Sequence, residues 1–312
     1  MSANQTPLVS VIIPCYNGAR FLAPAIGSAL NQTYPNVEVV VVNDGSTDDS
    51  GAIAAEFGSK IVLVNQENRG LSAARNQGVC VAKGEILMLL DADDIFLPTA
   101  VASRVSFFKA DPNLGLVAGY YREIDEHGIV QDRIPELRTV WFGQAFRQAV
   151  RRNWGPPVGW AFRREAYERV GGFDPLLKSC EDWDFVIRVS LKYAVEYEPS
   201  VQTHYRKMSG QMSSNYETML MNAGMVRKKS AVYAPNRWEN WLDGKYGQFE
   251  LGRRVLFAVL FQDGGPGRAK RVLQLMVRNP YLIWVFMLSA VSYILGKRAS
   301  QTAIPAPAEA AK

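Results

Sequence analysis

Cysteine and histidine are both scarce in this chain of 312 residues, which has three cysteines and two histidines. Cys15, Cys80 and Cys180 are odd in number and show no paired spacing, so a disulfide framework is not expected. A structural zinc site is not expected either, because no Cys-x-x-Cys pair is present. The first seven residues also lack the apolar core of a secretory signal. These features favour a cytoplasmic protein with reduced thiols.

Several motifs of common enzyme classes are missing as well. No Gly-x-Gly-x-x-Gly follows the first strand-like run, which disfavours a dinucleotide-binding Rossmann site. The phosphate-binding loop of P-loop nucleotidases and the Gly-x-Ser-x-Gly elbow of α/β-hydrolases are also absent. The net charge of +5 is modest, and no basic stripe with interleaved aromatics runs along the first two-thirds of the chain. Nucleic acid is therefore not an expected partner.

The first half of the chain alternates short apolar runs with helix-like segments. Strands are expected at residues 8–13, 37–42, 61–64 and 85–90, and helices at residues 21–32, 48–57, 71–82 and 98–109. We expect Gly84 to end the third helix. This alternation predicts an α/β fold with a mainly parallel sheet flanked by helices.

The second half is less regular. Strands are expected at residues 157–162 and 201–206, and helices at residues 181–191, 237–261 and 267–295. The predicted organisation is an α/β domain over residues 1–216, a helical extension over residues 217–300 and a disordered tail, rich in Ala and Pro, over residues 301–312.

Polar side chains directly follow three of the predicted strands, in the loops at residues 14–18, 43–46 and 91–94. Ligands of parallel sheets bind beyond the carboxyl ends of the strands, so these loops are candidates for a binding site. Asp91 and Asp93 could share a ribose and a divalent cation, because Mg²⁺ and Mn²⁺ prefer oxygen ligands and complete their shells with water and phosphates. The alternative is that Asp93 or Asp94 only caps the helix that follows.

Two further acidic positions have both a chemical and a structural interpretation. Asp44 could accept hydrogen bonds from a base or ribose, or it could simply belong to a turn of the Asn-Asp-Gly-Ser type. Glu181 and Asp182 could supply a general base that takes a proton from an acceptor hydroxyl. They could instead be acidic residues that favour a helix N-terminus, with Ser179 as the cap.

Taken together, these motifs resemble the family 2 glycosyltransferases, a large inverting group with the Rossmann-like GT-A fold. The resemblance covers roughly residues 8 to 215. The matching stretches are Pro14-Cys15-Tyr16-Asn17, Asn43-Asp44-Gly45-Ser46-Thr47-Asp48, Asn68-Arg69-Gly70, Ala74-Arg75-Asn76, Gly78, Gly84, Asp91-Ala92-Asp93-Asp94, Gly171-Gly172-Phe173-Asp174 and Glu181-Asp182.

The resemblance implies a role for each matching position. Tyr16 and Asp44 would contact the nucleotide base, and Asp91 would contact the ribose. Asp93 would ligate Mg²⁺ or Mn²⁺, and Asp182 would be the catalytic base of a single inverting displacement. The positions implied for nucleotide-sugar binding are Pro14, Tyr16, Asn17, Asp44, Arg75, Asp91, Ala92 and Arg206. The donor would be a UDP-, dTDP- or GDP-sugar.

The chain departs from the family pattern in its later part. Many relatives carry a histidine two residues after the arginine of Tyr205-Arg206, where this chain has Met208, so His204 is the alternative histidine. The Gln-x-x-Arg-Trp motif of processive relatives is absent, which favours transfer of one sugar. The aromatic residues Trp154, Trp160 and Phe162 either pack in the core or contact an acceptor, and Trp160 and Glu181 are the acceptor candidates.

Residues 281–295 are almost wholly apolar, and Arg278, Lys297 and Arg298 flank them. The stretch is shorter than the about 20 residues that a spanning helix needs. We expect a helix that packs on the protein or touches the inner face of the cytoplasmic membrane, with a true span as the third alternative.

Three functional classes follow. The first is an inverting glycosyltransferase, which the resemblance places in the synthesis of surface polysaccharides or lipid-linked glycans. The second is a sugar-phosphate nucleotidyltransferase, which would need a glycine-rich loop where the chain has residues 14–17. The third is a catalytically inactive sugar-binding module, which the acidic motifs disfavour.

Overall fold

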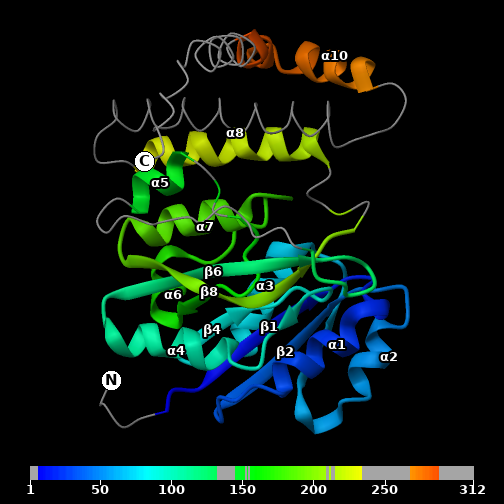
Figure 1. The fold of residues 1–312 in the computed structure, drawn as a ribbon, viewed down its shortest axis with the longest axis vertical. Coiled ribbons are helices and arrows are strands. Elements are labelled where there is room, and N and C mark those ends of the chain that lie inside the picture. The colour runs from blue at the N-terminus through cyan, green and yellow to red at the C-terminus, as the bar shows by residue number, and fades with distance from the viewer. Residues whose placement is uncertain are drawn as a thin grey trace, which may run out of the picture. The chain divides into compact units, whose positions relative to one another are not determined.

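The computed structural model describes residues 6–131, 145–151, 153, 155–208, 211, 215–233 and 268–287. The chain forms two compact units, Met1–Gly244 and Lys245–Lys312, and each is described by itself. Figure 1 shows the first unit as a twisted sheet with helices on both faces.

An eight-stranded sheet forms the centre of the described part of the first unit, in the order β3-β2-β1-β4-β7-β6-β8-β5. Its first half contains β1 (Val9–Cys15), β2 (Val37–Asp44), β3 (Val62–Gln66) and β4 (Ile86–Leu89). These strands pair in parallel. Every residue of β1 and β4 is buried, as expected for apolar runs covered on both faces. The four strands predicted for the first half are therefore confirmed.

The second half of the sheet mixes strand directions. It contains β5 (Ile95–Phe96), β6 (Leu114–Ile124), β7 (Ala161–Arg163) and β8 (Ala194–Arg206). β7 is antiparallel to β4 and to β6, whereas β6 and β8 are parallel. The short strand β5 pairs antiparallel with the end of β8. This pairing brings the loop after β4 next to the carboxyl end of β8.

Helices cover both faces of the sheet. The α-helices described in the first unit are α1 (Ala19–Leu30), α2 (Ser50–Ala55), α3 (Leu71–Val81), α4 (Ala100–Ala110), α5 (Ala145–Arg151), α6 (Arg164–Val170), α7 (Glu181–Ser190) and α8 (Tyr216–Tyr233). Helices α1 and α4 share a core cluster with Val11 and Ile13 of β1. On the opposite face, a Cβ added to Gly78 of α3 would clash with the Ile12 side chain, so glycine permits close packing there. Helices α5 and α8 both pack against α7.

Some local predictions are wrong, each for a tertiary reason. The long strand β6 was not predicted because Gly115 and Gly119 interrupt its pattern. A Cβ at Gly119 would clash with the buried guanidinium of Arg104. Gly84 does not end α3, because the C-cap of that helix is Ala82. Gly84 instead packs against β1: a Cβ at this position would lie 2.6 Å from the Ser10 nitrogen, so only glycine fits there.

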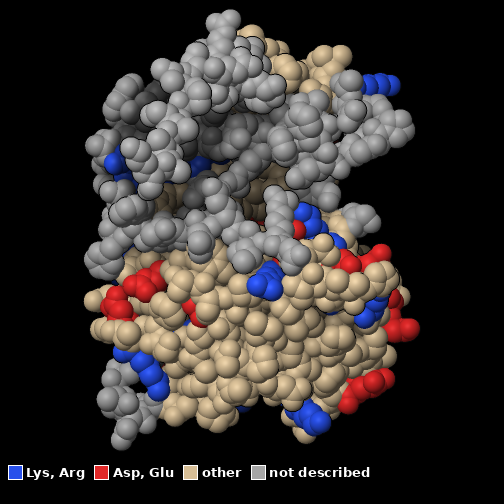
Figure 2. Space-filling model, viewed as in Figure 1, with Lys and Arg blue, Asp and Glu red and all other residues tan. Residues whose placement is uncertain are grey.

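The face of the molecule drawn in Figure 2 carries both signs of charge. On it, Lys and Arg lie interspersed with Asp and Glu around a broad uncharged area.

The described part of the second unit is helical. It contains α10 (Arg268–Arg278) and a helical segment at residues 281–287. None of the helices described here has both the length and the apolar character needed to cross a bilayer. The helix expected at residues 237–261, the end of the apolar stretch and the tail at 301–312 lie outside the described residues. The domain boundary near residue 216 stays a prediction, and α8 belongs to the first compact unit.

Candidate functional site

The three polar loops meet at one edge of the sheet. The backbone nitrogen of Asn17 donates to Ser46 Oγ at 3.0 Å, and the Thr47 nitrogen donates to Asn17 Oδ1 at 2.8 Å. A Cβ added to Gly18 would lie 3.4 Å from the Cβ of Ala92. The loops after β1, β2 and β4 are therefore in contact, as expected for the carboxyl ends of neighbouring parallel strands.

The loop after β2 also completes the N-terminus of α1. Ser50 Oγ accepts from the Gly18 nitrogen at 2.9 Å, and Asp48 Oδ2 accepts from the Ala19 nitrogen at 3.1 Å. These bonds satisfy amide groups that no residue of α1 can satisfy. Asp48 was expected inside the second helix, but that helix begins at Ser50. Its actual role is to brace the loop next to the candidate site.

Asp44 is buried and organises the next loop along the edge. Its carboxylate accepts from Gln66 Nε2 at 2.6 Å and from the Arg69 and Gly70 nitrogens at 2.9 Å each. The neighbouring Tyr16 is 54% exposed, so its ring is open to solvent at the same edge. A base contact by either residue stays a prediction. Sequence analysis did not predict the contact between Gln66 and Asp44. The one indication in the sequence was that Gln66 is a polar residue just after a strand-like run.

Arg75 connects the loop after β4 to helix α7. Its side chain is 1% exposed, with Nη2 2.9 Å from Asp91 Oδ1 and Nη1 2.5 Å from Glu181 Oε1. Burial by itself lowers the pKa of this guanidinium, but the charges of Asp91 and Glu181 outweigh that effect and raise it. Arg75 is therefore a permanent cation shared by two carboxylates that lie far apart in the sequence. This contact places Asp182 in the neighbourhood of the loop after β4 at residues 91–94, named here the aspartate loop.

Asp182 is buried in the first turn of α7. Its Oδ1 accepts from the Trp183 nitrogen at 2.6 Å and lies 3.5 Å from Asn153 Nδ2. Burial, followed by the charge of Glu181, raises the pKa of Asp182 to about 7, although the charge of Arg75 opposes the rise. A carboxylate with such a pKa can both accept and release a proton near neutrality.

Ser179 does not cap this helix. The N-cap is Cys180, which has a left-handed backbone conformation with φ of 62° and makes no side-chain capping bond. The Ser179 hydroxyl instead accepts from Asn222 Nδ2 of α8 at 3.0 Å. The predicted cap is therefore wrong, because a tertiary contact with α8 holds Ser179.

Carboxylates crowd together in the loop after β4. Burial, and then the charge of Asp91, raises the pKa of Asp93 to about 6. Burial, and then the charges of Asp93 and Asp91, holds the pKa of Asp94 well above its ordinary value. Such crowding favours the uptake of a proton or a cation.

Asp94 does not cap the helix that follows. Its Oδ1 accepts from the Arg206 nitrogen at 2.7 Å, and the next helix begins at Ala100 after Thr99. The capping alternative for Asp94 is therefore wrong. Asp93 is less enclosed, and its Oδ2 lies 3.4 Å from Gln211 Nε2.

A divalent cation fits these residues if it also takes ligands from elsewhere. Within the described ranges, no group of three or more His, Cys, Asp or Glu residues could hold a metal ion by itself. Mg²⁺ commonly binds through one or two carboxylates and obtains its other ligands from water and substrate phosphates. Asp93 and its crowded neighbours match that pattern.

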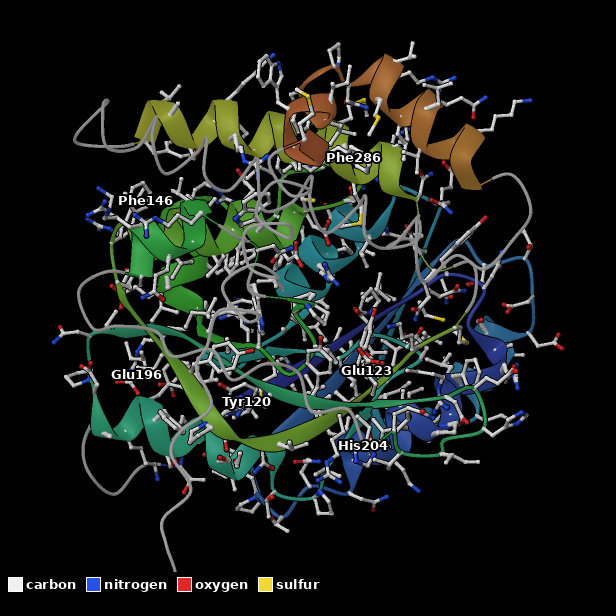
Figure 3. All side chains as sticks on the ribbon, turned by 45° about the horizontal axis from the view of Figure 1, so that its top comes forward. Tyr120, Glu123, Phe146, Glu196, His204 and Phe286 are labelled. Atoms are coloured by element: carbon white, nitrogen blue, oxygen red, sulfur yellow. The ribbon has the colours of Figure 1, made fainter. Side chains whose placement is uncertain are left out.

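Arg206 and His204 belong to the end of β8, where His204 (labelled in Figure 3) pairs with Ile95 and Arg206 bonds to the aspartate loop. The Arg206 guanidinium donates to the carbonyl oxygens of Asp93 and Asp125, both at 2.8 Å, and lies 4.4 Å above the ring of Phe21. It thus fixes the backbone that carries Asp93. His204 pairs with Ile95 in the sheet, and burial together with nearby arginines lowers its pKa. A contact of Arg206 with a diphosphate stays a prediction.

The aromatic acceptor candidates differ in burial. Trp160 is 1% exposed, and Phe162 packs against Phe173 and Phe185. Both positions fit the core-packing interpretation. An acceptor contact by Trp160 or Glu181 stays a prediction, and Trp154 lies outside the described residues.

Comparison with known proteins assigns the family. The model of "Glycosyl transferase family 2" matches residues 10–171, which is more than half of the chain. The chain belongs to glycosyltransferase family 2. The match includes the three loops at the sheet edge and Arg75, and it ends before Asp182.

Family 2 relatives align over parts of this chain. An uncharacterized glycosyltransferase of Nostoc sp. is 34% identical over 181 residues, which are 54% of each protein. EpsH of Bacillus subtilis, which carries a glycosyltransferase name, is 28% identical over 236 residues, 71% of this chain and 67% of EpsH. An uncharacterized glycosyltransferase of Rickettsia felis is 45% identical over 125 residues, 39% of this chain. The chain spans only 18% to 38% of the length of the matched Rickettsia proteins.

Solved structures confirm the predicted GT-A fold of this family 2 member. The mannosyltransferase PcManGT of Pyrobaculum calidifontis, in complex with GDP-Man and Mn²⁺, has a TM-score of 0.60 at 21% identity and covers 96% of this chain and 89% of its own. TarS 1–349 of S. aureus has a TM-score of 0.60 at 20% identity and covers 80% of this chain and 74% of its own. At these identities the likeness concerns the fold alone.

Proposed function

We propose that this chain transfers one sugar from a nucleotide-diphosphate sugar to an acceptor hydroxyl with inversion of the anomeric configuration. The observation that supports this most is the Arg75 bridge, with Asp91 on one side and Glu181 on the other. It brings the loop proposed to hold the donor next to the helix that carries Asp182. A donor site and a proton acceptor must be neighbours for a direct transfer.

Asp182 acts as the general base in this proposal. It takes the proton of the acceptor hydroxyl while the hydroxyl oxygen forms a bond to the anomeric carbon and the bond to the diphosphate breaks. The pKa of about 7 favours this role, because a useful fraction of the carboxylate is ionised near neutral pH. Attack on the face opposite the leaving group gives inversion.

The donor would bind at the sheet edge, with Tyr16 and the loop around Asp44 at the base and Asp91 at the ribose. Several structures of similar fold support a nucleotide-sugar donor. TarS 1–349 has been solved with UDP and with UDP-GlcNAc, and PcManGT with GDP-Man. We infer a UDP-, GDP- or dTDP-sugar for this chain.

Asp93 would hold a Mg²⁺ or Mn²⁺ ion, which would supply positive charge for the leaving diphosphate. Three observations support this assignment: the raised pKa of Asp93, the crowding of Asp91 and Asp94 beside it, and the Mn²⁺ in the PcManGT structure. The backbone of Asp93 is fixed by Arg206, which keeps its carboxylate at the edge of the site.

A panel of UDP-, GDP- and dTDP-sugars with Mn²⁺ tests the proposed function. We expect one donor to release its nucleoside diphosphate and to raise the melting temperature of the protein. Release of sugar 1-phosphate with a nucleotide would support a nucleotidyltransferase instead. If no donor turns over or shifts the melting temperature, an inactive module becomes the better description.

We also propose that the second unit touches the cytoplasmic membrane, where a glycan or lipid-linked acceptor for surface polysaccharide would lie. Leu273 and Val277 of α10 are 63% and 71% exposed, and Trp284 is 66% exposed. Lys270 and Arg278 of the same helix are also exposed. Basic residues beside exposed apolar ones are typical of helices that bind anionic lipid surfaces.

Val277→Glu is expected to weaken binding to phosphatidylglycerol vesicles at least about tenfold in co-sedimentation, because it places a negative charge on the apolar side of α10. Val232→Glu is the matched control, since Val232 is 82% exposed on α8 in the first unit. Equal binding by wild type and both variants, or equal binding to phosphatidylcholine, would remove the proposed contact.

A further inference from the structure

Three acidic residues share the first turn of α7: Glu181, Asp182 and Asp184. The two outer carboxylates have their own cations. Glu181 pairs with Arg75, and Asp184 pairs with Arg188 and Lys229. Among the described residues, no ion pair includes Asp182. The charges of Glu181 and Asp184 are therefore balanced by cations, whereas Asp182 has a raised pKa and can accept a proton.

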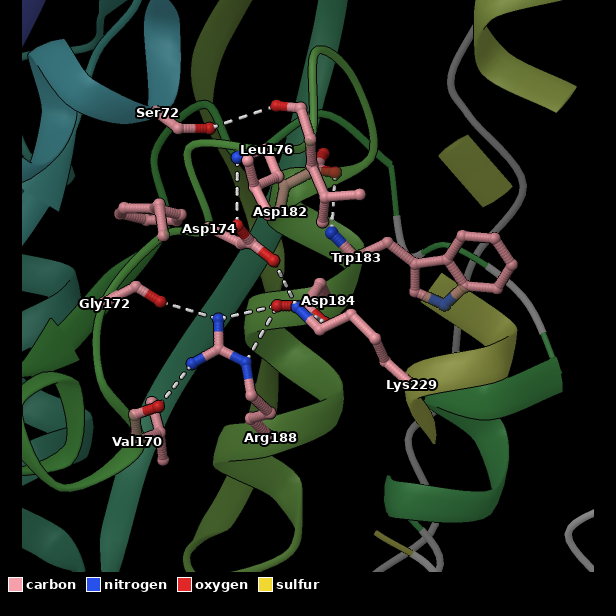
Figure 4. A network of polar contacts seen from close by, with 12 residues as sticks. Ser72, Val170, Gly172, Asp174, Leu176, Asp182, Trp183, Asp184, Arg188 and Lys229 are labelled. Carbon is pink, nitrogen blue, oxygen red and sulfur yellow. Dashed lines mark hydrogen bonds and ion pairs between the residues drawn. The ribbon is translucent and has the colours of Figure 1, made fainter. Parts of the chain in front are cut away.

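Lys229 of α8 lies between two carboxylates from different segments (Figure 4). Its Nζ is 2.7 Å from Asp174 Oδ2 and 2.8 Å from Asp184 Oδ1. Asp174 in turn accepts from the Leu176 nitrogen at 2.9 Å and so shapes the loop that leads into α7. Partial burial lowers the pKa of Lys229, but its bonds to Asp174 and Asp184 outweigh this and raise it. Lys229 is thus a charged link between α8, α7 and the preceding loop.

Arg188 cannot replace this link. Its Nε donates to Asp184 Oδ2 at 2.8 Å, and its two terminal nitrogens donate to the carbonyl oxygens of Val170 and Gly172 at 2.6 Å each. Arg188 therefore ties α7 to the end of α6. Only Lys229 among these cations comes from α8.

Other contacts from α8 surround the same turn. Asn222 donates to Ser179, the Cys180 thiol contacts the carbonyl oxygen of Met219, and Arg227 lies 5.0 Å from the centre of the Trp183 ring. Cys180, between Ser179 and the acidic turn, has the positive φ that residues other than glycine rarely adopt. Such a conformation persists only where surrounding contacts hold it. Helix α8 supplies those contacts on both sides of Asp182.

We propose that Lys229 is a positioning residue for Asp182: it ties the first turn of α7 to α8 and balances the acidic charge beside the base. The inference rests on the proposed function, which assigns Asp182 as the base. Cations contact the first turn of α7 or its carboxylates, namely Arg75 of α3, Arg188 of α7, and Arg227 and Lys229 of α8. The carboxylates that face them are Glu181 and Asp184 of α7 and Asp174 of the preceding loop.

The test compares Lys229→Met with Lys229→Arg and with Lys228→Met. Lys228 is the exposed neighbour on the same helix, so its variant makes the same change of charge away from the turn. On the donor that is active, Lys229→Met is expected to lower kcat about 10- to 100-fold with the donor KM within about twofold, because the base is misplaced while the donor site is intact. Lys229→Arg should recover most of the loss, and Lys228→Met should match wild type.

A second readout does not depend on turnover. The carboxyl carbon of Asp182 can be titrated by NMR with ¹³C-labelled aspartate, and its signal is identified by its loss in Asp182→Asn. Removing a nearby cation is expected to raise the pKa of Asp182 in Lys229→Met by about half a pH unit or more. An unchanged titration together with unchanged kcat would overturn the proposal.

A double variant separates position from charge. Asp174→Asn with Lys229→Met restores the net charge, so the pKa of Asp182 should return toward the wild-type value while kcat stays low. Recovery of kcat would show that Lys229 acts through charge alone and would overturn the positioning role. If wild type turns over no donor, the proposed function fails, and the NMR titration alone decides whether Lys229 controls Asp182.

Discussion

Replacing Asp182 with asparagine is expected to lower turnover by roughly 10²–10⁴-fold while donor binding stays unchanged, which is the usual scale for a lost general base. The amide has the same shape and keeps an oxygen that can accept from the Trp183 nitrogen, so the turn should be preserved. It cannot take the proton of an acceptor hydroxyl. Release of nucleoside diphosphate measures turnover, and calorimetric titration with UDP or GDP measures binding.

Two control variants make this result specific. Glu168→Gln changes an exposed carboxylate of α6 and should leave turnover at the wild-type value. Glu181→Gln removes one partner of Arg75, so it tests the adjacent acid. Near-normal turnover in Asp182→Asn would reduce Asp182 to a structural role, and a large loss in Glu181→Gln alone would move the base to Glu181.

The same carboxylate should set the pH dependence of the enzyme. Turnover is expected to rise as pH increases through about 7, because only ionised Asp182 can accept a proton. Folding responds in the opposite direction. The folded protein binds the Asp182 proton up to pH about 7, whereas an unfolded aspartate loses it near about 4. The stability that this group contributes is present at low pH and is lost as pH rises from about 4 through about 7. In Asp182→Asn the free energy of unfolding should therefore depend less on pH over that range.

Asp93→Ala is expected to abolish metal-dependent nucleotide binding. Asp93 is the ligand proposed to hold the cation, and the leaving diphosphate would supply others, so its loss should remove the coupling between metal and nucleotide. Titrating UDP or GDP with Mn²⁺, and again with EDTA, measures that coupling. In wild type the coupling should also weaken below pH about 6, where a proton competes for the carboxylate.

Asp49→Ala provides the control for this variant. Asp49 is exposed at the start of α2 and makes no side-chain capping bond there. Asp49→Ala therefore changes the net charge by the same amount as Asp93→Ala but leaves the aspartate loop unchanged. If Asp93→Ala and wild type give the same titration with Mn²⁺, Asp93 has no metal role and the crowded carboxylates serve only the fold.

Local pattern was sufficient to predict part of the fold. The apolar runs at the centres of β1, β2 and β4 are buried on both faces and rich in β-branched and aliphatic residues, which is typical of strands in a covered sheet. The strand β6 could not be found in this way. Two glycines interrupt it, and the one at Gly119 is needed only because Arg104 packs there from α4.

Capping was the least predictable feature. Ser179 and Asp94 both have side chains suited to a local helix cap, yet each bonds instead to a group far along the chain. Residue type indicates that such a side chain needs a partner, but it does not indicate which partner. The choice depends on which backbone groups the folded chain leaves unsatisfied nearby.

The sequence by itself determined the chemical groups at the site and the order in which they follow the strands. Tertiary structure decided which carboxylates are paired and which one stays basic. Arg75 neutralises Glu181, and Lys229 neutralises Asp184, across long stretches of chain. The pKa of Asp182 is raised because burial and the charge of Glu181 act on it, and in the part of the chain that the structure describes no cation forms an ion pair with it. Burial and charge separation exist only once the chain is folded, so no local pattern could distinguish these three acids.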